Sequence, residues 1–175
     1  AHLVCSPARV KSIASRQNVL VVRIRNARRE RRTTRKNLVL DGLKVIADAH
    51  QSGIAIHTVL VSRTAFKSDP DIKTLCTQFD QNKTDLATCS DGIMAAVSPL
   101  RSPSNMVALG SHRPMSSENI ISSGPNSLIV MPLAVQDPGN LGAIIRSAVA
   151  AGSAGVIVDN RSADPYGWKA LRGSM

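Results

Sequence analysis

Residues 127–158, SLIVMPLAVQDPGNLGAIIRSAVAAGSAGVIV, decide the fold of the C-terminal part of the chain. The run from Ser127 to Met131 is solidly apolar and predicts a strand buried in a parallel sheet. Apolar side chains then recur at helical spacing from Leu141 to Ala148, and Gly152 ends that helix. Gly155 to Val158 predicts the next strand. The order of these elements is that of a β-α-β unit.

One β-α-β unit cannot bury both faces of a parallel sheet. After it, the turn at Asp164-Pro165 leads into a last helix that is expected to begin near Trp168. Residues 125–175 are therefore expected to be an incomplete domain, whose uncovered faces need further chain or a partner.

The residues before this unit show a separate alternating α/β pattern. A basic helix is expected from Asn18 to Arg29, with a weak apolar stripe at Val19, Val22 and Ala27. Strands are expected at 37–40, 56–61, 85–88 and 105–109, and helices after Gly42, at 71–79 and after Ser90. The serine-rich stretch 110–124 is the expected linker, so the predicted domains are 1–109 and 125–175.

The charge balance indicates a polyanionic partner. The 175 residues include 22 Lys and Arg against 12 Asp and Glu, giving a net charge of +10. Such a balance favours nucleic acid or an anionic membrane surface. No apolar run has the roughly 18 to 20 residues of a membrane span. RNA is the expected partner, and a cytoplasmic location is expected, an organellar one being the alternative. Aromatic residues make up 2%, which argues against base stacking as the main mode of binding.

The positive charge is concentrated near the start of the chain. Eleven of the 22 basic residues precede Asn37, against a single acidic residue, Glu30. This density favours contact with RNA phosphates over a merely solvated helix face. The predicted phosphate contacts form a basic cluster: Arg28, Arg29, Arg31, Arg32, Arg35 and Lys36.

The segment from Asp137 to Ala148, DPGNLGAIIRSA, leaves the carboxyl end of a strand, where α/β sheets usually place ligands. Asn140 is expected to cap the helix, and Arg146, flanked by apolar residues, is expected to need an anionic partner. One interpretation is a dinucleotide-binding turn, with Asp159 on a ribose. The glycines are spaced G-x-x-G and lie several residues after the strand, which argues against it. The charge balance favours RNA.

Cysteine and histidine spacing predicts no metal site. Cys5, Cys76 and Cys89 form no C-x-x-C pair, and the four histidines lie at no ligand spacing from them. The cysteines are interpreted as reduced thiols.

DPGNLGAIIRSA, followed by a GVI strand and DPYGWKALRGSM, resembles the SpoU/TrmH family of RNA 2′-O-ribose methyltransferases, of the SPOUT class. SRQN, a basic helix and LVLDG resemble the ribosomal-protein-like substrate-binding domain of many members; Asp41 stands where they often have Glu. The resemblance implies an N-terminal α/β RNA-binding domain, followed by the first part of a trefoil-knot-type α/β methyltransferase domain without the knot region.

The resemblance also implies roles for single residues. Asn140 and Arg146 match the family's first motif and are the expected catalytic residues, and Arg172 matches an arginine close to the RNA. The cofactor would be S-adenosylmethionine, bound mainly by motifs expected beyond Met175. The expected substrate is structured RNA, rRNA rather than tRNA, and the full-length protein is expected to be a homodimer. The chain alone is expected to be inactive. A non-enzymatic RNA-binding protein is the alternative, and a dinucleotide-binding domain a weaker one.

Overall fold

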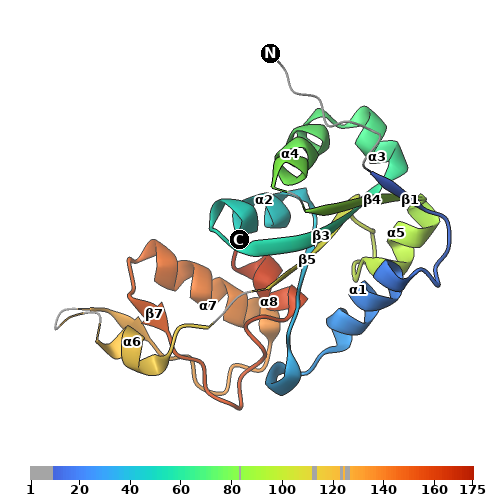
Figure 1. Ribbon diagram of the computed structural model, residues 1–175. Helices are drawn as coiled ribbons and strands as arrows, with labels where there is room; N and C mark the ends of the chain where they lie inside the picture. Colours follow the sequence, from blue (N-terminus) through green and yellow to red (C-terminus); the bar gives the residue numbers. More distant parts are fainter. Residues whose placement is uncertain (1–9, 83, 112–113, 123, 125–126) are drawn as a thin grey trace. The chain divides into compact units, whose positions relative to one another are not determined.

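The computed structural model describes residues 10–82, 84–111, 114–122, 124 and 127–175. Contacts divide the chain into two compact units, 1–112 and 113–175 (Figure 1). The division falls inside the predicted linker.

The first unit is built on a five-stranded mixed sheet in the order β1-β4-β3-β5-β2. β1, β4 and β3 run parallel, while β5 is antiparallel to both β3 and β2. β5, the last strand of this unit in the sequence, lies inside the sheet rather than at an edge. The strands are β1 (Lys11–Ile13), β2 (Leu38–Asp41), β3 (Ala55–Ser62), β4 (Asp85–Cys89) and β5 (Met106–Ser111).

Helices cover both faces of this sheet (Figure 1). α1 (Val19–Arg29) and α5 (Asp91–Val97) pack on one face, where their buried side chains join those of the strands in one aliphatic core. α2 (Leu43–Gln51) and α4 (Pro70–Gln81) lie on the other face, and α3 (Arg63–Ser68) leads into α4. A predominantly aliphatic sequence therefore produces a three-layer α/β/α domain.

The buried stripe of α1 differs from the expected one. The Asn18 side chain caps the helix by accepting from the backbone N–H of Leu20 at 3.0 Å. Counting from this start, Val21, Ile24 and Ala27 face the core. Val19 is 82% exposed, so the predicted stripe of Val19, Val22 and Ala27 was right only at Ala27.

Three elements of the first unit were not predicted, namely the three-residue strand β1, the short 3-10 helix η1 (Arg32–Thr34) and the six-residue helix α3. Ser90 begins α5 as expected, but its side chain makes no capping bond. The linker expected at 110–124 also contains structure, because β5 continues through Ser111 and a short helix, α6 (Ser117–Ile121), follows.

The second unit contains the predicted β-α-β unit. β6 (Ile129–Val130) pairs in parallel with β7 (Gly155–Val156), and α7 (Pro138–Ala150) connects them. Both strands are shorter than predicted. The expected last helix is α8 (Trp168–Gly173).

Large apolar side chains remain exposed in the second unit. The described examples are Met115, Ile121, Leu128, Met131, Leu133 and Val149. In the part of the chain that the structure describes, no helix combines the length and apolar character needed to cross a membrane.

Candidate functional site

The start of α7 is fixed by Asp137. Its Oδ1 accepts a hydrogen bond from the backbone N–H of Asn140 at 2.7 Å, and Pro138 occupies the first helical position. Proline suits that position because it has no N–H to satisfy. The prediction that Asn140 caps the helix was therefore wrong: the helix begins earlier, and Asn140 lies inside its first turn. The exposed side-chain amide of Asn140 makes no hydrogen bond to the described residues, so it can bind a ligand.

Arg146 lies on α7 beyond its middle and is exposed. Its Nη1 donates to the backbone oxygen of Met175 at 3.2 Å. The apolar neighbours suggested an enclosed guanidinium, but Ile144 and Ile145 are only half-buried and Arg146 is exposed. A guanidinium presents five donors, and a single carbonyl leaves most of them available to an anionic group.

α7 and α8 are in close contact through glycines. A Cβ atom on Gly142 would lie 2.5 Å from the Ala170 carbonyl oxygen and 2.9 Å from the Cα of Gly173. Only a residue without a side chain fits at such a distance. Arg172 is exposed on α8 beside Gly173, so the two predicted arginines, Arg146 and Arg172, lie on two helices held together by backbone contact.

Asp159 joins the two loops that follow β6 and β7. Its carboxylate accepts from the backbone N–H of Ala134, at 3.2 and 3.3 Å, and from that of Ser162, at 2.9 Å. The Ser162 hydroxyl also donates to it. These hydrogen bonds, that of Ser162 first, lower the pKa of Asp159. Because its oxygens hold the protein's own loops, the carboxylate is not placed to bind a ribose, and the dinucleotide interpretation loses its key residue.

The loop after α1 is built around Glu30. The Glu30 carboxylate accepts from the backbone N–H groups of Lys36, at 2.7 Å, and Asn37, at 3.1 Å, and from the Asn37 amide. Burial alone would raise the pKa of Glu30, but these hydrogen bonds and the charge of Arg35 lower it overall. The acidic residue inside the basic stretch therefore fixes the shape of the loop.

This loop divides the basic cluster into two groups. Arg35 donates to the carbonyl oxygens of Ala27 and Glu30, and Arg28 donates weakly to that of Ser98, at 3.5 Å. These two arginines take part in the internal structure and are half-buried. The exposed members are Arg29, Arg31, Arg32 and Lys36.

A cavity of about 470 Å³ in the first unit was missed by the sequence analysis. It depends on β1, whose three residues carry no clear strand signal.

In the part that the structure describes, no group of three or more His, Cys, Asp or Glu could hold a metal. Cys76 and Cys89 are buried thiols, and burial together with Asp91 raises the pKa of Cys89 to about 11; Cys5 lies outside the described residues.

Two family models match the chain in succession. The MRM3-like substrate binding domain matches residues 20–108, and the SpoU rRNA Methylase family matches residues 127–175. The first match covers half of the chain, and the second contains α7 with Arg146.

Known proteins match over both units. The 23S rRNA (guanosine(2553)-2′-O)-methyltransferase RlmP of Bacillus subtilis is 28% identical over 148 residues, which is 84% of this chain and 53% of that enzyme. The AdoMet-bound rRNA methyltransferase from Sinorhizobium meliloti is 26% identical with a TM-score of 0.78, over 95% of this chain and 61% of that one. The AdoMet complex of the SpoU methyltransferase AviRb from Streptomyces viridochromogenes shares the fold, at 23% identity and a TM-score of 0.70, over 90% of this chain and 59% of that one.

The chain thus spans about half the length of the curated relative it matches. The order of the two matched domains is the one that the sequence analysis predicted, and the α/β fold is confirmed in both units. The chain belongs to the SpoU/TrmH family of RNA methyltransferases, with an MRM3-like substrate-binding domain before the methylase segment.

Proposed function

We propose that the protein carrying this chain transfers a methyl group from S-adenosylmethionine to the 2′-hydroxyl of a ribose in structured RNA. The observation that carries this proposal is Arg146, exposed on the helix α7, which carries the motif segment Asp137–Ala148. Ribosomal RNA is the better candidate substrate because RlmP and the Sinorhizobium enzyme are both rRNA methyltransferases by name.

The reaction needs a group that stabilises negative charge on the RNA. A ribose 2′-oxygen that attacks a methyl group loses its proton as the new bond forms, and a nearby cation stabilises the developing oxyanion. Arg146 keeps its charge at any ordinary pH, so it is suited to hold this oxygen or the adjacent phosphate and unsuited to accept the proton. The Asn140 amide, three residues into the same helix, can donate to a ribose or phosphate oxygen.

The methyl donor supplies its methyl group on a sulfonium, which is electrophilic without a metal. The hollow on the sheet side of α7 has a volume of about 370 Å³, and Ser147 alone among its lining residues has a polar side chain. Such a lining does not match a zwitterionic nucleoside with an adenine and a ribose. No residue of this chain is therefore assigned to the cofactor.

The basic cluster would supply most of the affinity for RNA. Arg29, Arg31, Arg32 and Lys36 are exposed around a loop whose shape is fixed by Glu30. Phosphate contacts of this kind give salt-dependent affinity with little sequence preference. Arg172, on the helix that packs against α7, is the proposed RNA contact nearest the reacting ribose. We also propose a cytoplasmic homodimer as the working form of the full-length protein.

The test is methyl transfer by the full-length natural protein and its Arg146→Ala variant. Labelled S-adenosylmethionine and rRNA transcripts are the substrates, and 2′-O-methylnucleosides are identified after digestion. Removing one preorganised donor from a developing oxyanion commonly lowers kcat by about 100-fold to 1,000-fold. Arg146→Lys keeps the charge without the planar fork and should recover part of the loss.

An unchanged rate in Arg146→Ala would remove Arg146 from the reaction. If the wild-type protein binds RNA and transfers no methyl group to any transcript, the second candidate function, a non-enzymatic RNA-binding protein, is favoured. The exposed basic cluster is the observation that supports this candidate.

A further inference from the structure

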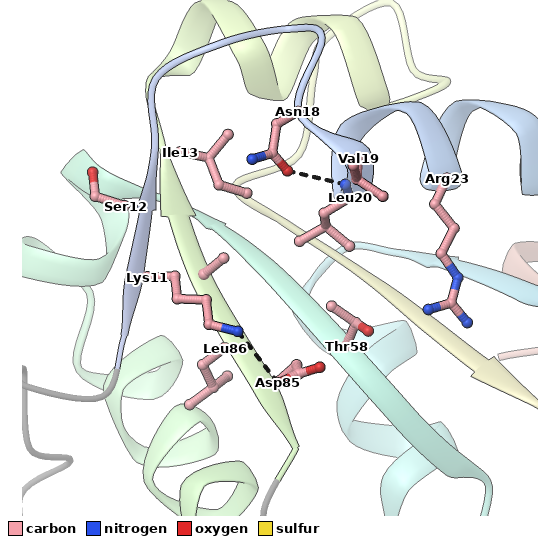
Figure 2. A pocket seen from close by; sticks show the side chains of 11 residues that line it. Lys11, Ser12, Ile13, Asn18, Val19, Leu20, Arg23, Thr58, Asp85 and Leu86 are labelled. Carbon is pink, nitrogen blue, oxygen red and sulfur yellow. Dashed lines mark hydrogen bonds and ion pairs between the residues drawn. The ribbon is translucent and has the colours of Figure 1, made fainter.

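The cavity in the first unit has no role in the proposed methyl transfer. It lies between β1, β3, β4 and the first turns of α1 (Figure 2), and its volume of about 470 Å³ is within the usual range of small-molecule sites. The polar residues that line it are Lys11, Ser12, Asn18, Arg23, Thr58 and Asp85.

Thr58 is the most informative of these residues. It is 5% exposed, yet its hydroxyl makes no hydrogen bond to any residue that the structure describes. Buried hydroxyls in folded proteins are nearly always paired, and an unpaired one costs free energy. The β3–β5 register shifts between Ile56 and Thr58, immediately before this side chain. Bulges of this kind often redirect a side chain next to a functional site.

The rest of the lining combines an apolar interior with charged groups at the rim. Ile13, Leu20 and Ala87 contribute aliphatic walls. At one side, Lys11 and Asp85 are both largely exposed and lie 4.0 Å apart. Arg23 is exposed, and Figure 2 shows its side chain extending from α1 toward the sheet. With two cations against one carboxylate, the rim favours an anion.

We propose that this cavity binds one unpaired nucleotide of the RNA substrate, with its base between the aliphatic walls, a base edge hydrogen-bonded to Thr58, and a phosphate at Arg23. Proteins read RNA sequence mainly at unpaired bases, which can leave the helical stack. α1 connects the two surfaces: its residues up to Arg23 line the cavity, and the basic cluster begins at Arg28, about 7.5 Å farther along the helix at 1.5 Å per residue. The proposal rests on the proposed RNA-binding function.

The test compares three RNA hairpins that differ at one position: fully paired, with a single bulged nucleotide, and with the same bulge lacking its base. Binding of residues 1–175 is measured by fluorescence anisotropy. We expect the base-bearing bulge to bind about fivefold to tenfold tighter than the abasic one, the range set by a hydrogen bond and a small apolar contact. Equal affinity for the two bulges overturns the proposal without any variant.

Thr58→Val removes the hydroxyl and keeps the shape. It should reduce the preference for the base-bearing bulge to about twofold or less, while Thr58→Ser retains the preference. The valine variant loses no internal hydrogen bond with the described residues, so its melting temperature should not fall. A preference that Thr58→Val leaves intact overturns the proposal.

Arg23→Gln should weaken both bulged hairpins and leave the paired hairpin nearly unchanged. Arg25→Gln is the matched control, because Arg25 is exposed on the same helix and does not line the cavity. It should affect the three hairpins alike. Equal behaviour of the two variants contradicts the placement of the phosphate at Arg23.

Two further measurements distinguish a failure of the cavity proposal from a failure of the proposed RNA-binding function. If Arg29→Gln/Arg31→Gln binds every hairpin as well as wild type does, the proposed RNA-binding role of the cluster fails. If that variant loses affinity while the bulge preference is absent, only the cavity proposal fails. The binding of uridine monophosphate and of adenosine monophosphate is also measured without RNA. If either nucleotide binds more tightly than the bulged RNA, and Thr58→Val abolishes this binding, the site belongs to a free nucleotide and the proposal is overturned.

Discussion

The two units support their arginines in different ways. In the first unit, the basic cluster begins in the last turn of α1, whose buried side chains, Val21, Ile24 and Ala27, pack against a sheet that helices cover on both faces. In the second unit, Arg146 and Arg172 lie on α7 and α8, which contact each other through glycines. The sheet of this unit has two strands of two residues each. Six of the eight large apolar side chains described as exposed belong to this second unit.

This difference shows how binding and chemistry can depend on different structural supports. The cluster needs only a stable surface, since phosphate contacts tolerate some variation in position. A catalytic arginine must be positioned much more closely. For Arg146, the proposed catalytic arginine, the local structure that can provide this positioning consists of the Asp137 cap, the Gly142–Gly173 contact and the Asp159 hydrogen bonds.

The largest expected effect comes from filling the glycine contact. Gly142→Val should destabilise the second unit by about 3 kcal/mol, because the new side chain meets the Ala170 carbonyl and the Gly173 backbone, which cannot rotate away. Hydrogen exchange should show amides of α7 and α8 losing protection while those of the first unit keep theirs.

Gly92→Ala is the matched control in the first unit. Its added Cβ would meet only an arginine nitrogen, at 3.8 Å, so the variant should be neutral or more stable by about 0.5 kcal/mol. If Gly142→Val causes amides in both units to lose protection, the two units unfold together. That result would contradict the claim that each unit has its own structural support.

The second expected effect concerns the cluster. Arg29→Gln/Arg31→Gln should lower RNA affinity about tenfold near physiological salt and flatten the dependence of log K on log salt by about 1.5 to 2, as two phosphate contacts are lost. Lys67→Gln/Lys73→Gln removes the same charge from α3 and α4, where both lysines are exposed. If this control variant has the same effect, net charge rather than the cluster determines affinity.

The third expected effect is a pH dependence in each unit. The fold lowers the pKa of Glu30 and of Asp159, so each contributes stability above its ordinary pKa, and that stability is lost as the pH falls through the lowered value. Relative to wild type, Glu30→Gln and Asp159→Asn should be less stable at pH 7. The differences should shrink below about pH 4.5 for Glu30 and below about pH 4 for Asp159.

Urea unfolding at pH 7 and pH 3 measures these differences, with hydrogen exchange to assign them to a unit. A difference that persists unchanged at pH 3 would mean that the lost hydrogen-bond geometry, and not the charge of the carboxylate, accounts for it.

The smallest expected effect is at Ala134, which has a positive φ of 54° in the loop after β6. A non-glycine residue in this conformation is strained by about 1 kcal/mol or more, and Asp159 holds its N–H in place. Ala134→Gly should relieve the strain, and after the entropy cost of glycine the gain should be about 0.5 kcal/mol. A loss of stability in thermal unfolding would contradict this account.

Much of the fold could be predicted because its signals are local. The β-branched run of β3, the proline and acidic first turn of α4, and the helical spacing in α7 each lie within one element. β1 could not be predicted, because Lys11, Ser12 and Ile13 form a strand only by pairing with β4. α6 was missed for a similar reason, since its buried Ile120 packs against Gly155, thirty-five positions later.

The candidate site could be predicted only in part. The motif around Arg146 is continuous in sequence and was found, but the cap was assigned to Asn140 although Asp137 begins the helix. The division of the basic cluster by Glu30 and Arg35 depends on a loop conformation that composition does not encode. The cavity around Thr58 is formed by four separate elements, so no single stretch of sequence shows it.

The central claim is that the first unit supplies RNA affinity and the second supplies the reaction. Steady-state methyl transfer by the full-length natural protein, with RNA concentration varied, tests it in one measurement. Arg29→Gln/Arg31→Gln should raise KM for RNA with kcat nearly unchanged, whereas Arg146→Ala should lower kcat with little change in KM. A cluster variant that lowers kcat as much as Arg146→Ala does, or an Arg146→Ala variant that changes KM alone, would contradict the account.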